Sequence, residues 1–267
     1  MHLLAFTPSG VRPARPRGAR LLISAVACGA LLTAATGCGG SDGPAKPSAP
    51  AKPSAPAHNG NPAAAGSAHP VNGPGIPGLG ERTGARIPSG TRQLVVVYGE
   101  DRDSADSLAV LYEKHGATWD RTAAWPAHNG RRGWTTDHQL DDERSPAGVF
   151  TLTDAGGSLR SPGTKLPYWY DDHAFAASLK QGDEAHAHDF DYVIAIDYNH
   201  VKGTPPFDWN RPEGVEKGGG IWLHIDHGDG TSACVTVPEP AMKTLLYTLD
   251  PAQHPAVVMG DRERLMR

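Results

Sequence analysis

Cys234 and two histidines just before it have the residue types and spacing that nucleophilic catalysis requires. His224 and His227 lie with Cys234 in one stretch, residues 218–238. A free cysteine titrates near about 8.5 and only its thiolate attacks well, so a nucleophilic thiol needs a base close to it. An imidazole can act as that base at neutral pH. We therefore predict that Cys234 is a nucleophile and His224 its base, with His227 as the alternative base.

A short strand is expected to carry the preferred histidine. The segment 221–226 alternates with a period of two, which is typical of a β-strand. Its core-facing positions would be Ile221, Leu223 and Ile225, and its other face would carry Trp222, His224 and Asp226. On that second face, Asp226 is a candidate to orient the imidazole and Trp222 is a candidate to line a substrate groove, although packing is the commoner role of a strand tryptophan.

The glycines after this strand predict a turn that returns the chain towards Cys234. A tight hairpin centred on Asp229 would pair His227 with Thr231 and His224 with Cys234. Directly paired residues have Cβ atoms about 5 Å apart, which is close enough for proton transfer. His224 is preferred because it lies on the strand, whereas His227 borders the turn, where a solvated side chain is the default.

Residues 91–267 predict one mainly β catalytic domain with few helices and a core of useful size. Strand patterns are expected at 93–98, 106–114, 118–125, 148–153, 191–198 and 256–259, and a helix at 240–249. Two long segments, 156–189 and 199–218, interrupt this pattern. The first holds Tyr168 and Trp169 and is interpreted as a substrate-binding loop, with a poorly ordered surface insertion as the alternative.

The N-terminal part of the chain predicts export and anchoring. Residues 1–37 combine a basic run with an apolar stretch that is shorter than the roughly 20 residues of a membrane span, as in a signal peptide. Ala35-Thr36-Gly37-Cys38 resembles the lipoprotein cleavage box of bacteria, so Cys38 is a candidate lipidation site. Ordinary secretion is the alternative. Residues 38–90, rich in Pro, Ala, Ser and Gly, are interpreted as a tether and a transition to the domain.

The predicted export would leave Cys234 as a single unpaired cysteine. Cys28 would leave with the signal peptide and Cys38 would carry lipid, which leaves Cys234 alone in an oxidising compartment where structural cysteines normally pair. The chain has a formal charge of −4 and loses four arginines with residues 1–37, so the exported form is still more acidic. An acidic chain argues against nucleic acid as a partner. The sequence does not indicate an oligomeric state.

Two short motifs resemble the L,D-transpeptidase family, which has a YkuD-type catalytic domain. The segment Thr231-Ser232-Ala233-Cys234-Val235 matches the family pattern of Ser or Thr, any residue, Gly, Cys, then Ile or Val, except at Ala233. The segment Ser145-Pro146-Ala147-Gly148-Val149-Phe150 matches a second pattern of Thr or Ser, Pro, any residue, Gly, any residue, then an aromatic residue. The resemblance spans residues 93–260. Thr236 stands where many members have an arginine.

The resemblance implies a β-sandwich-like domain that cross-links peptidoglycan stem peptides, with a role in cell wall biogenesis and cell shape. Cys234 would attack the carbonyl of the third stem residue and release D-alanine, and an amine of a neighbouring stem would accept the acyl group. Backbone N–H groups around Ala233 and Cys234 would form an oxyanion hole, with Ser232 and Thr231 shaping the turn. The enzyme would face the cell wall from the outer face of the bacterial cytoplasmic membrane and would need no cofactor or metal.

Three alternatives remain open from the sequence. Water could accept the acyl group, which would make the protein an L,D-carboxypeptidase or another cysteine hydrolase of peptidoglycan. A zinc site could be assembled from His224, Asp226, His227, His186 and His188, although no helical metal-binding signature is present. The chain could also be a wall-binding lipoprotein without catalytic activity.

Overall fold

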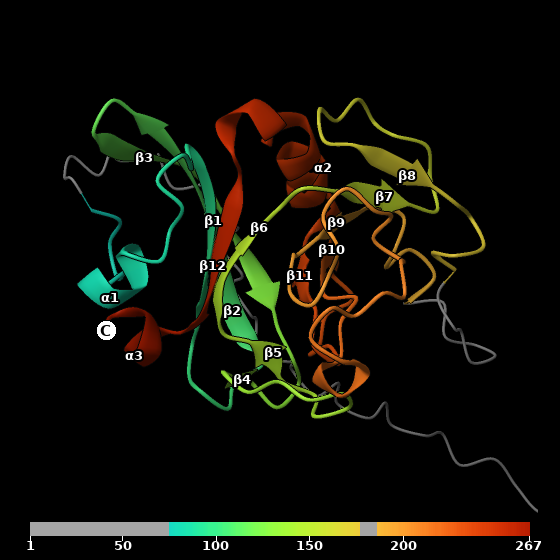
Figure 1. Ribbon diagram of the computed structural model, residues 1–267, viewed down its shortest axis with the longest axis horizontal. Helices are drawn as coiled ribbons and strands as arrows, with labels where there is room; N and C mark the ends of the chain where they lie inside the picture. The colour runs from blue at the N-terminus through green and yellow to red at the C-terminus, as the bar shows by residue number, and fades with distance from the viewer. Residues whose placement is uncertain (1–74, 177–185) are drawn as a thin grey trace, which may run out of the picture. The chain divides into compact units, whose positions relative to one another are not determined.

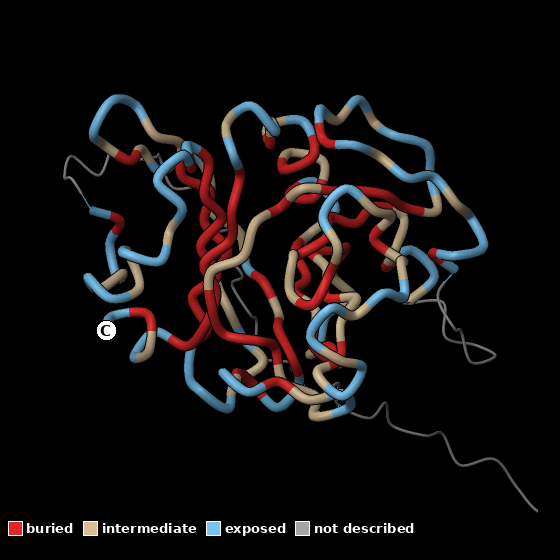
Figure 2. Tube along the Cα trace, in the orientation of Figure 1, coloured by how far each residue is buried: buried red, intermediate tan, exposed pale blue. Residues whose placement is uncertain are grey.

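Strand β1 (Gln93–Gly99) is apolar along most of its length and is buried at every position. It pairs in parallel with β12 (Ala256–Asp261) and antiparallel with β2 (Asp106–His115). A strand that is covered on both faces has a continuous apolar run rather than an alternating one, and Leu-Val-Val-Val in β1 is such a run. The whole of β1 and β12 and the middle of β2 are among the buried segments drawn in red in Figure 2.

The computed structural model describes residues 75–176 and 186–267, which belong to one unit of the chain. The predicted signal peptide 1–37, the lipidation site Cys38 and the tether up to residue 74 lie outside the described residues, so these expectations remain predictions. Residues 177–185 of the proposed substrate-binding loop also lie outside them.

Ten strands form one curled sheet, in the order β6-β12-β1-β2-β3-β11-β10-β9-β7-β8 (Figure 1). The further strands of this sheet are β3 (Thr118–His128), β6 (Gly148–Thr151), β7 (Ala155–Gly157), β8 (Tyr168–Tyr170), β9 (Val193–Ala195), β10 (Trp222–Ile225) and β11 (Val235–Val237), while β4 (Trp134–Thr135) and β5 (Ser145–Pro146) pair separately. The helices of the described residues are α1 (Glu81–Gly84), α2 (Glu239–Thr248) and α3 (Arg262–Leu265), with 3₁₀ turns η2 (Val215–Lys217) and η3 (Pro251–Gln253). The predicted mainly β domain with few helices is confirmed.

The two faces of β1 contribute to two different hydrophobic cores. Val95 and Val97 point into the larger core, which also holds the buried face of α2 and the apolar residues of β10 and β11. Leu94 and Val96 point into the smaller core, where Leu265 of α3 covers the sheet. Because successive side chains of a strand point to opposite faces, one apolar strand can serve both cores.

Helix α2 follows β11 directly and closes the larger core beside β10 (Figure 1). Its buried residues recur at helical spacing: Ala241, Met242, Leu245 and Leu246. Pro240 lies in the first turn, where its missing N–H leaves no intrahelical hydrogen bond unmade. The helix predicted at 240–249 is therefore confirmed to within one residue at each end.

The predicted hairpin between His224 and Cys234 is wrong. Strands β10 and β11 are parallel, with Leu223 opposite Val235 and His224 opposite Thr236. The connection does not fold back as a tight turn, because Thr231 pairs with Gly130, at the far end of β3. After this contact the chain forms β11, which lies between β3 and β10 in the sheet. The predicted loop 156–189 also differs, since it contains β8, which pairs in parallel with β7.

Candidate functional site

Cys234 lies immediately before β11 and alongside the first residue of β10. The backbone N–H of Trp222 donates to Cys234 Sγ at 3.4 Å, and the thiol lies 3.7 Å from the carbonyl oxygen of Gly220. Cys234 is half-buried and is the free cysteine of the described residues. Burial raises the pKa of Cys234 to about 11, and the contact with the Trp222 N–H opposes this shift. The thiol is therefore protonated at neutral pH.

His224 is buried on β10, with 3% of its surface exposed. Its Nδ1 lies 3.0 Å from the carbonyl oxygen of Ile225, which can only accept, so Nδ1 donates, and the ring also has a backbone hydrogen bond to Asp189. The ring of Phe190 packs edge-on against the imidazole, with 5.0 Å between the centroids. Burial, followed by repulsion from His227, lowers the pKa of His224 to about 4. A neutral imidazole is the form that can accept a proton.

One pocket of about 270 Å³ brings the thiol and the imidazole together. Its lining residues are Arg131, His186, Asp189, Phe190, His224, His227, Asp229, Gly230, Thr231, Ser232 and Cys234. Both members of the predicted catalytic pair line this pocket despite the wrong strand register. Parallel pairing explains this outcome: Cys234 lies beside Trp222, whose side chain is on the same face of β10 as that of His224.

Two buried hydroxyl groups hold the turn that ends at Cys234. Ser145 Oγ lies 2.6 Å from the carbonyl oxygen of Ala233 and accepts the N–H of Gly130 at 2.8 Å, and Thr231 Oγ1 donates to the carbonyl of Cys234 at 2.7 Å. In a trans peptide the N–H points away from the preceding carbonyl. The contact of Ser145 with Ala233 therefore directs the N–H of Cys234 to the opposite side. Sequence reasoning assigned no role to Ser145, although it begins the second motif.

Ala233 is compatible with its position in this turn. It is 7% exposed and has a negative φ, unlike the few non-glycine residues with positive φ in the described part of the chain. The alanine that replaces the expected glycine therefore causes no backbone strain. Ser232, which is exposed, forms the rim of the pocket beside it.

His227 is not the solvated loop residue that its position beside a turn suggested. Only 6% of its side chain is exposed, and its Nδ1 lies 2.8 Å from Asp229 Oδ1, but not in hydrogen-bonding geometry. Its ring stacks against His224 with 5.9 Å between centroids and lies 4.5 Å from the ring of His186. Burial against other rings explains the difference. His227 thus borders the base from one side.

The structure assembles potential metal ligands at this pocket in a combination that differs from the predicted one. Donor atoms of His186, Asp189 and His227 lie within 4.8 Å of one another, a spacing that could hold a metal ion. His188 instead contacts Asp191 at 2.8 Å. His224 uses its Nδ1 on a backbone carbonyl. The alternative of a metal site on this pocket therefore depends on Asp189, which the sequence analysis did not single out.

The carboxylate of Asp226 is engaged away from the imidazole that it was expected to orient. Asp226 accepts hydrogen bonds from His128 Nδ1 at 2.7 Å and from Thr236 Oγ1 at 2.5 Å. Hydrogen bonds from these two partners lower the pKa of Asp226 against the effect of burial. The carbonyl of Ile225 fixes the ring of His224 instead.

The three aromatic residues predicted for the groove lie outside the pocket lining. Trp222 packs its ring against Phe190, with 5.3 Å between centroids, and donates through Nε1 to the carbonyl of Pro206. Tyr168 donates to the carbonyl of Leu159, and Trp169 is exposed on β8 at the edge of the sheet. Of these residues, Trp222 contacts Cys234, and it does so through its backbone.

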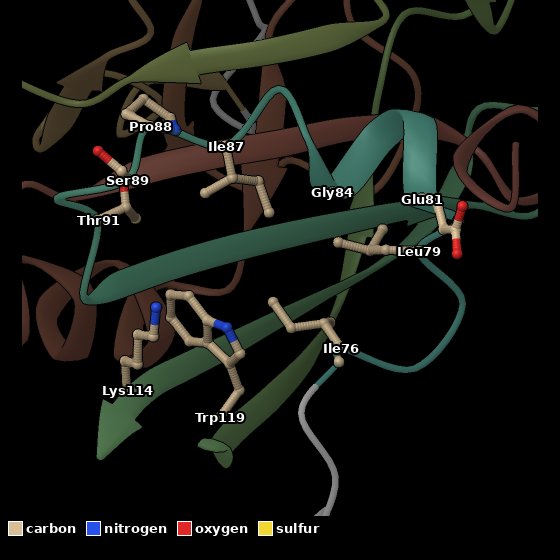
Figure 3. Close-up of a pocket in the computed structure, with 12 residues that line it drawn as sticks. Ile76, Leu79, Glu81, Gly84, Ile87, Pro88, Ser89, Thr91, Lys114 and Trp119 are labelled. Atoms are coloured by element: carbon tan, nitrogen blue, oxygen red, sulfur yellow. The ribbon is translucent and has the colours of Figure 1, made fainter. Parts of the chain in front are cut away.

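A larger pocket of about 430 Å³ lies between the segment of residues 75–91 and the β2–β3 hairpin (Figure 3). Its apolar side chains include Ile76, Leu79 and Ile87, which point towards a common space with Trp119, while Lys114 lies 5.4 Å from the centroid of the Trp119 ring (Figure 3). No cysteine or histidine lines it. We therefore assign the candidate active site to the smaller pocket.

Comparisons with known proteins do not identify a function for this chain. The sequence matches no protein-family model and no curated protein. The structure of Bd1075 from Bdellovibrio bacteriovorus is similar, with 17% sequence identity and a TM-score of 0.35. The match covers 70% of this chain and 55% of Bd1075, and a likeness of this strength carries no argument. No helix of residues 75–176 and 186–267 has the length and hydropathy that crossing a membrane requires.

Proposed function

We propose that the protein is a cysteine acyltransferase that forms L,D cross-links between peptidoglycan stem peptides. One observation carries the proposal: Cys234 and His224 line the same pocket, and the imidazole proton is held on Nδ1 by the carbonyl of Ile225. A thiol and a neutral imidazole that line one pocket provide the two groups that general-base activation of a nucleophile requires.

The reaction begins with an uncharged pair. As Cys234 Sγ attacks the carbonyl carbon of the third stem residue, its proton passes to Nε2 of His224. The tetrahedral intermediate then collapses, the bond to D-alanine breaks, and the leaving amine takes the proton from His224. An amine of a second stem attacks the thioester, gives a proton to His224 and releases the thiol, which regains that proton. The enzyme returns to its starting state without a cofactor.

The hydrogen bond from Ser145 to the carbonyl of Ala233, in the turn before β11, supports an oxyanion hole at the N–H of Cys234. Ser145 fixes the carbonyl of Ala233, and the Cys234 N–H is part of the same rigid peptide plane. A fixed donor stabilises the charge that develops on the attacked carbonyl, because it needs no reorientation during the reaction. Removal of one such donor in comparable enzymes costs about 3 kcal/mol.

The two motifs of the transpeptidase resemblance are joined by the hydrogen bond of Ser145 to Ala233, which favours this family among cysteine enzymes. Ser145 begins one motif, and Ala233 and Cys234 belong to the other. Thr236, at the position of the family's usual arginine, hydrogen-bonds to Asp226 and is fully buried. Arg131 lines the pocket and is half-exposed, and its guanidinium lies 3.5 Å from the carboxylate of Glu143, so we propose that it supplies a cation that a substrate carboxylate can share.

Product analysis with defined stem peptides tests this proposal. The chain without its signal peptide is incubated with a tetrapeptide stem, with and without a second stem as amine donor, and the products are identified by mass spectrometry. We expect D-alanine release and an amine-dependent cross-link, both lost in Cys234→Ala. Release without a cross-link would replace transfer by hydrolysis, and full activity of Cys234→Ala would contradict the cysteine mechanism.

A further inference from the structure

Three titratable side chains meet in the interior at a place that is separate from the Cys234 pocket. Asp154 precedes β7, Asp197 follows β9, and His200 begins the long segment that leads to β10. One donor atom from each lies within 4.8 Å of the others, and none of the three residues lines the pocket. The cluster therefore needs an explanation of its own.

Two of the donor atoms in this cluster are buried without a hydrogen-bond partner. Asp154 is 0% exposed and its Oδ1 has no hydrogen-bond partner. The side chain of His200 is 3% exposed, and its Nε2 also has no hydrogen-bond partner. His200 Nε2 lies 3.9 Å from Asp154 Oδ2, which is too far for a hydrogen bond. A buried carboxylate without compensation is strongly unfavourable, so two unpartnered atoms at one point indicate a missing partner.

The neighbouring groups bind the carboxylates but do not neutralise them. Asp154 Oδ2 accepts from the hydroxyl of Thr153 at 2.7 Å and from the N–H of Gly203 at 2.8 Å. Asp197 accepts from the hydroxyl of Thr151, and its oxygens lie 3.1 Å from Thr153 Oγ1, whose single proton it shares with Asp154. All of these donors are neutral. In the described residues no lysine or arginine forms an ion pair with either carboxylate, although Lys202 acts on Asp197 from a distance.

We propose that Asp154, Asp197 and His200 bind a divalent transition-metal ion such as Zn²⁺. Two carboxylate oxygens and one imidazole nitrogen form a ligand set that suits a borderline ion, and a water molecule would complete tetrahedral coordination. The ion would supply the charge that the neutral donors lack, and it would use the two unpartnered atoms. Asp154 Oδ1 and His200 Nε2 are the ligand atoms that the structure assigns.

The position of the cluster gives the ion a structural role. It would tie the β6–β7 connection to the segment between β9 and β10, which is also held by Asp154 at Gly203 and by Asn199 at the carbonyl of Gly218. That segment ends at Gly220, whose carbonyl lies beside Cys234 Sγ. The ion would therefore stabilise the segment that leads to the active site, without contact with substrate.

Metal binding by the full exported chain tests this inference. All variants carry Cys234→Ala, so that the thiol cannot take the ion, and after chelator treatment each is titrated with Zn²⁺ by calorimetry. We expect one tight ion in the parent chain, at least a hundredfold weaker binding in His200→Gln, and unchanged tight binding in His186→Gln. His186 belongs to the other potential ligand set, so it provides a matched control. Loss of the tight ion in His186→Gln alone would overturn the proposal.

Thermal unfolding gives a second readout that does not need a variant. An ion that binds only the folded chain should raise the Tm of the chelated protein by about 5 °C or more when Zn²⁺ is in large excess over its Kd. A chelated chain that keeps its Tm and binds no ion would overturn the proposal and leave a buried water as the partner of Asp154 and His200.

Discussion

At the scale of single residues, the proposed catalytic pair, Cys234 and His224, is neutral before any substrate binds. Burial raises the pKa of Cys234 to about 11 and lowers that of His224 to about 4, so both shifts disfavour the charged forms. A thiolate–imidazolium pair would require the opposite order of the two values. In the proposed mechanism, the proton of Cys234 therefore has to move during attack on the substrate, and His224 is the general base that would accept it.

The raised pKa of Cys234 predicts how the alkylation rate of this thiol depends on pH. Because only the thiolate reacts, the rate of Cys234 with iodoacetamide should rise about tenfold per pH unit between pH 6 and 9, since the whole range lies below the thiol pKa. The modified residue is quantified by mass spectrometry, and Cys234→Ala gives the background. A simple thiol should level off near its own pKa of about 8.5.

A rate that is already constant above pH 5 would contradict the neutral pair. That result would mean that Cys234 is ionised beside a protonated His224. It would replace general-base catalysis by a preformed ion pair at the same two positions.

At the scale of elements, the candidate active site depends on a contact between segments that are distant in the sequence. The turn before β11 is held by Ser145, which forms the first position of β5 and is 0% exposed. Its hydroxyl joins the carbonyl of Ala233 to the N–H of Gly130 near the end of β3. Three segments of the chain therefore share one buried side chain.

Ser145→Ala should weaken both the fold and the chemistry. Removal of the hydroxyl leaves a buried N–H and a buried carbonyl without their partner, so we expect a loss of about 2–3 kcal/mol in the free energy of unfolding. The N–H of Cys234 would also lose its fixed direction, and acylation of Cys234 should slow roughly tenfold or more. Urea denaturation and the time course of adduct formation measure the two effects.

Ser232→Ala is the matched control for stability, because Ser232 lies in the same turn but is exposed. We expect its free energy of unfolding to change by less than about 0.5 kcal/mol. Equal stability losses in the two variants would show that the buried hydrogen bonds of Ser145 have no special role.

The elements themselves were accessible from the sequence, whereas the pairing between them was not. The alternation around His224 and the helical spacing in α2 are local patterns, and both elements are present. The pairing of β10 with β11 depends on Thr231 and Gly130, which are far apart in the chain and which a local turn signal at Gly228 and Gly230 cannot reveal. The two-residue pairs of β4 and β5 are also too short for a periodic pattern.

At the scale of the whole molecule, the buried imidazole links the stability of the fold to pH. The pKa of His224 falls from its ordinary 6.5 to about 4 on folding, so between these values the unfolded chain binds a proton that the native chain does not. Stability must then fall as the pH falls from 6.5 to 4. In the chain without a bound ion, Asp197, whose pKa is raised to about 6 by burial, acts in the opposite direction.

Comparison of the native chain with His224→Gln isolates the contribution of His224 to the pH dependence of stability, since the other groups titrate alike in both proteins. We expect the difference in the free energy of unfolding to change by about 3 kcal/mol between pH 7 and pH 4, to the disadvantage of the native chain. Urea denaturation at several pH values provides the measurement. Parallel stability curves for the two proteins would indicate that His224 is readily protonated in the folded state.

The site as a whole was only partly predictable, because several of its members act through tertiary contacts. Residue type and the predicted export of a lone thiol singled out Cys234 and His224, and the structure places both at one pocket. His227 and Asp226 were assigned from their place beside a strand, but ring stacking buries the first, and His128 with Thr236 engages the second. These partners come from β3 and β11, and no local pattern identifies them.

The central claim is that Cys234 is a nucleophile that becomes acylated, and intact-mass analysis with a carbapenem tests it most directly. Transpeptidases of the family that this sequence resembles are typically acylated by such compounds at their cysteine. The account predicts one covalent adduct on the native chain, located at Cys234, and none on Cys234→Ala. A native chain without an adduct, or an equal adduct on Cys234→Ala, would contradict it.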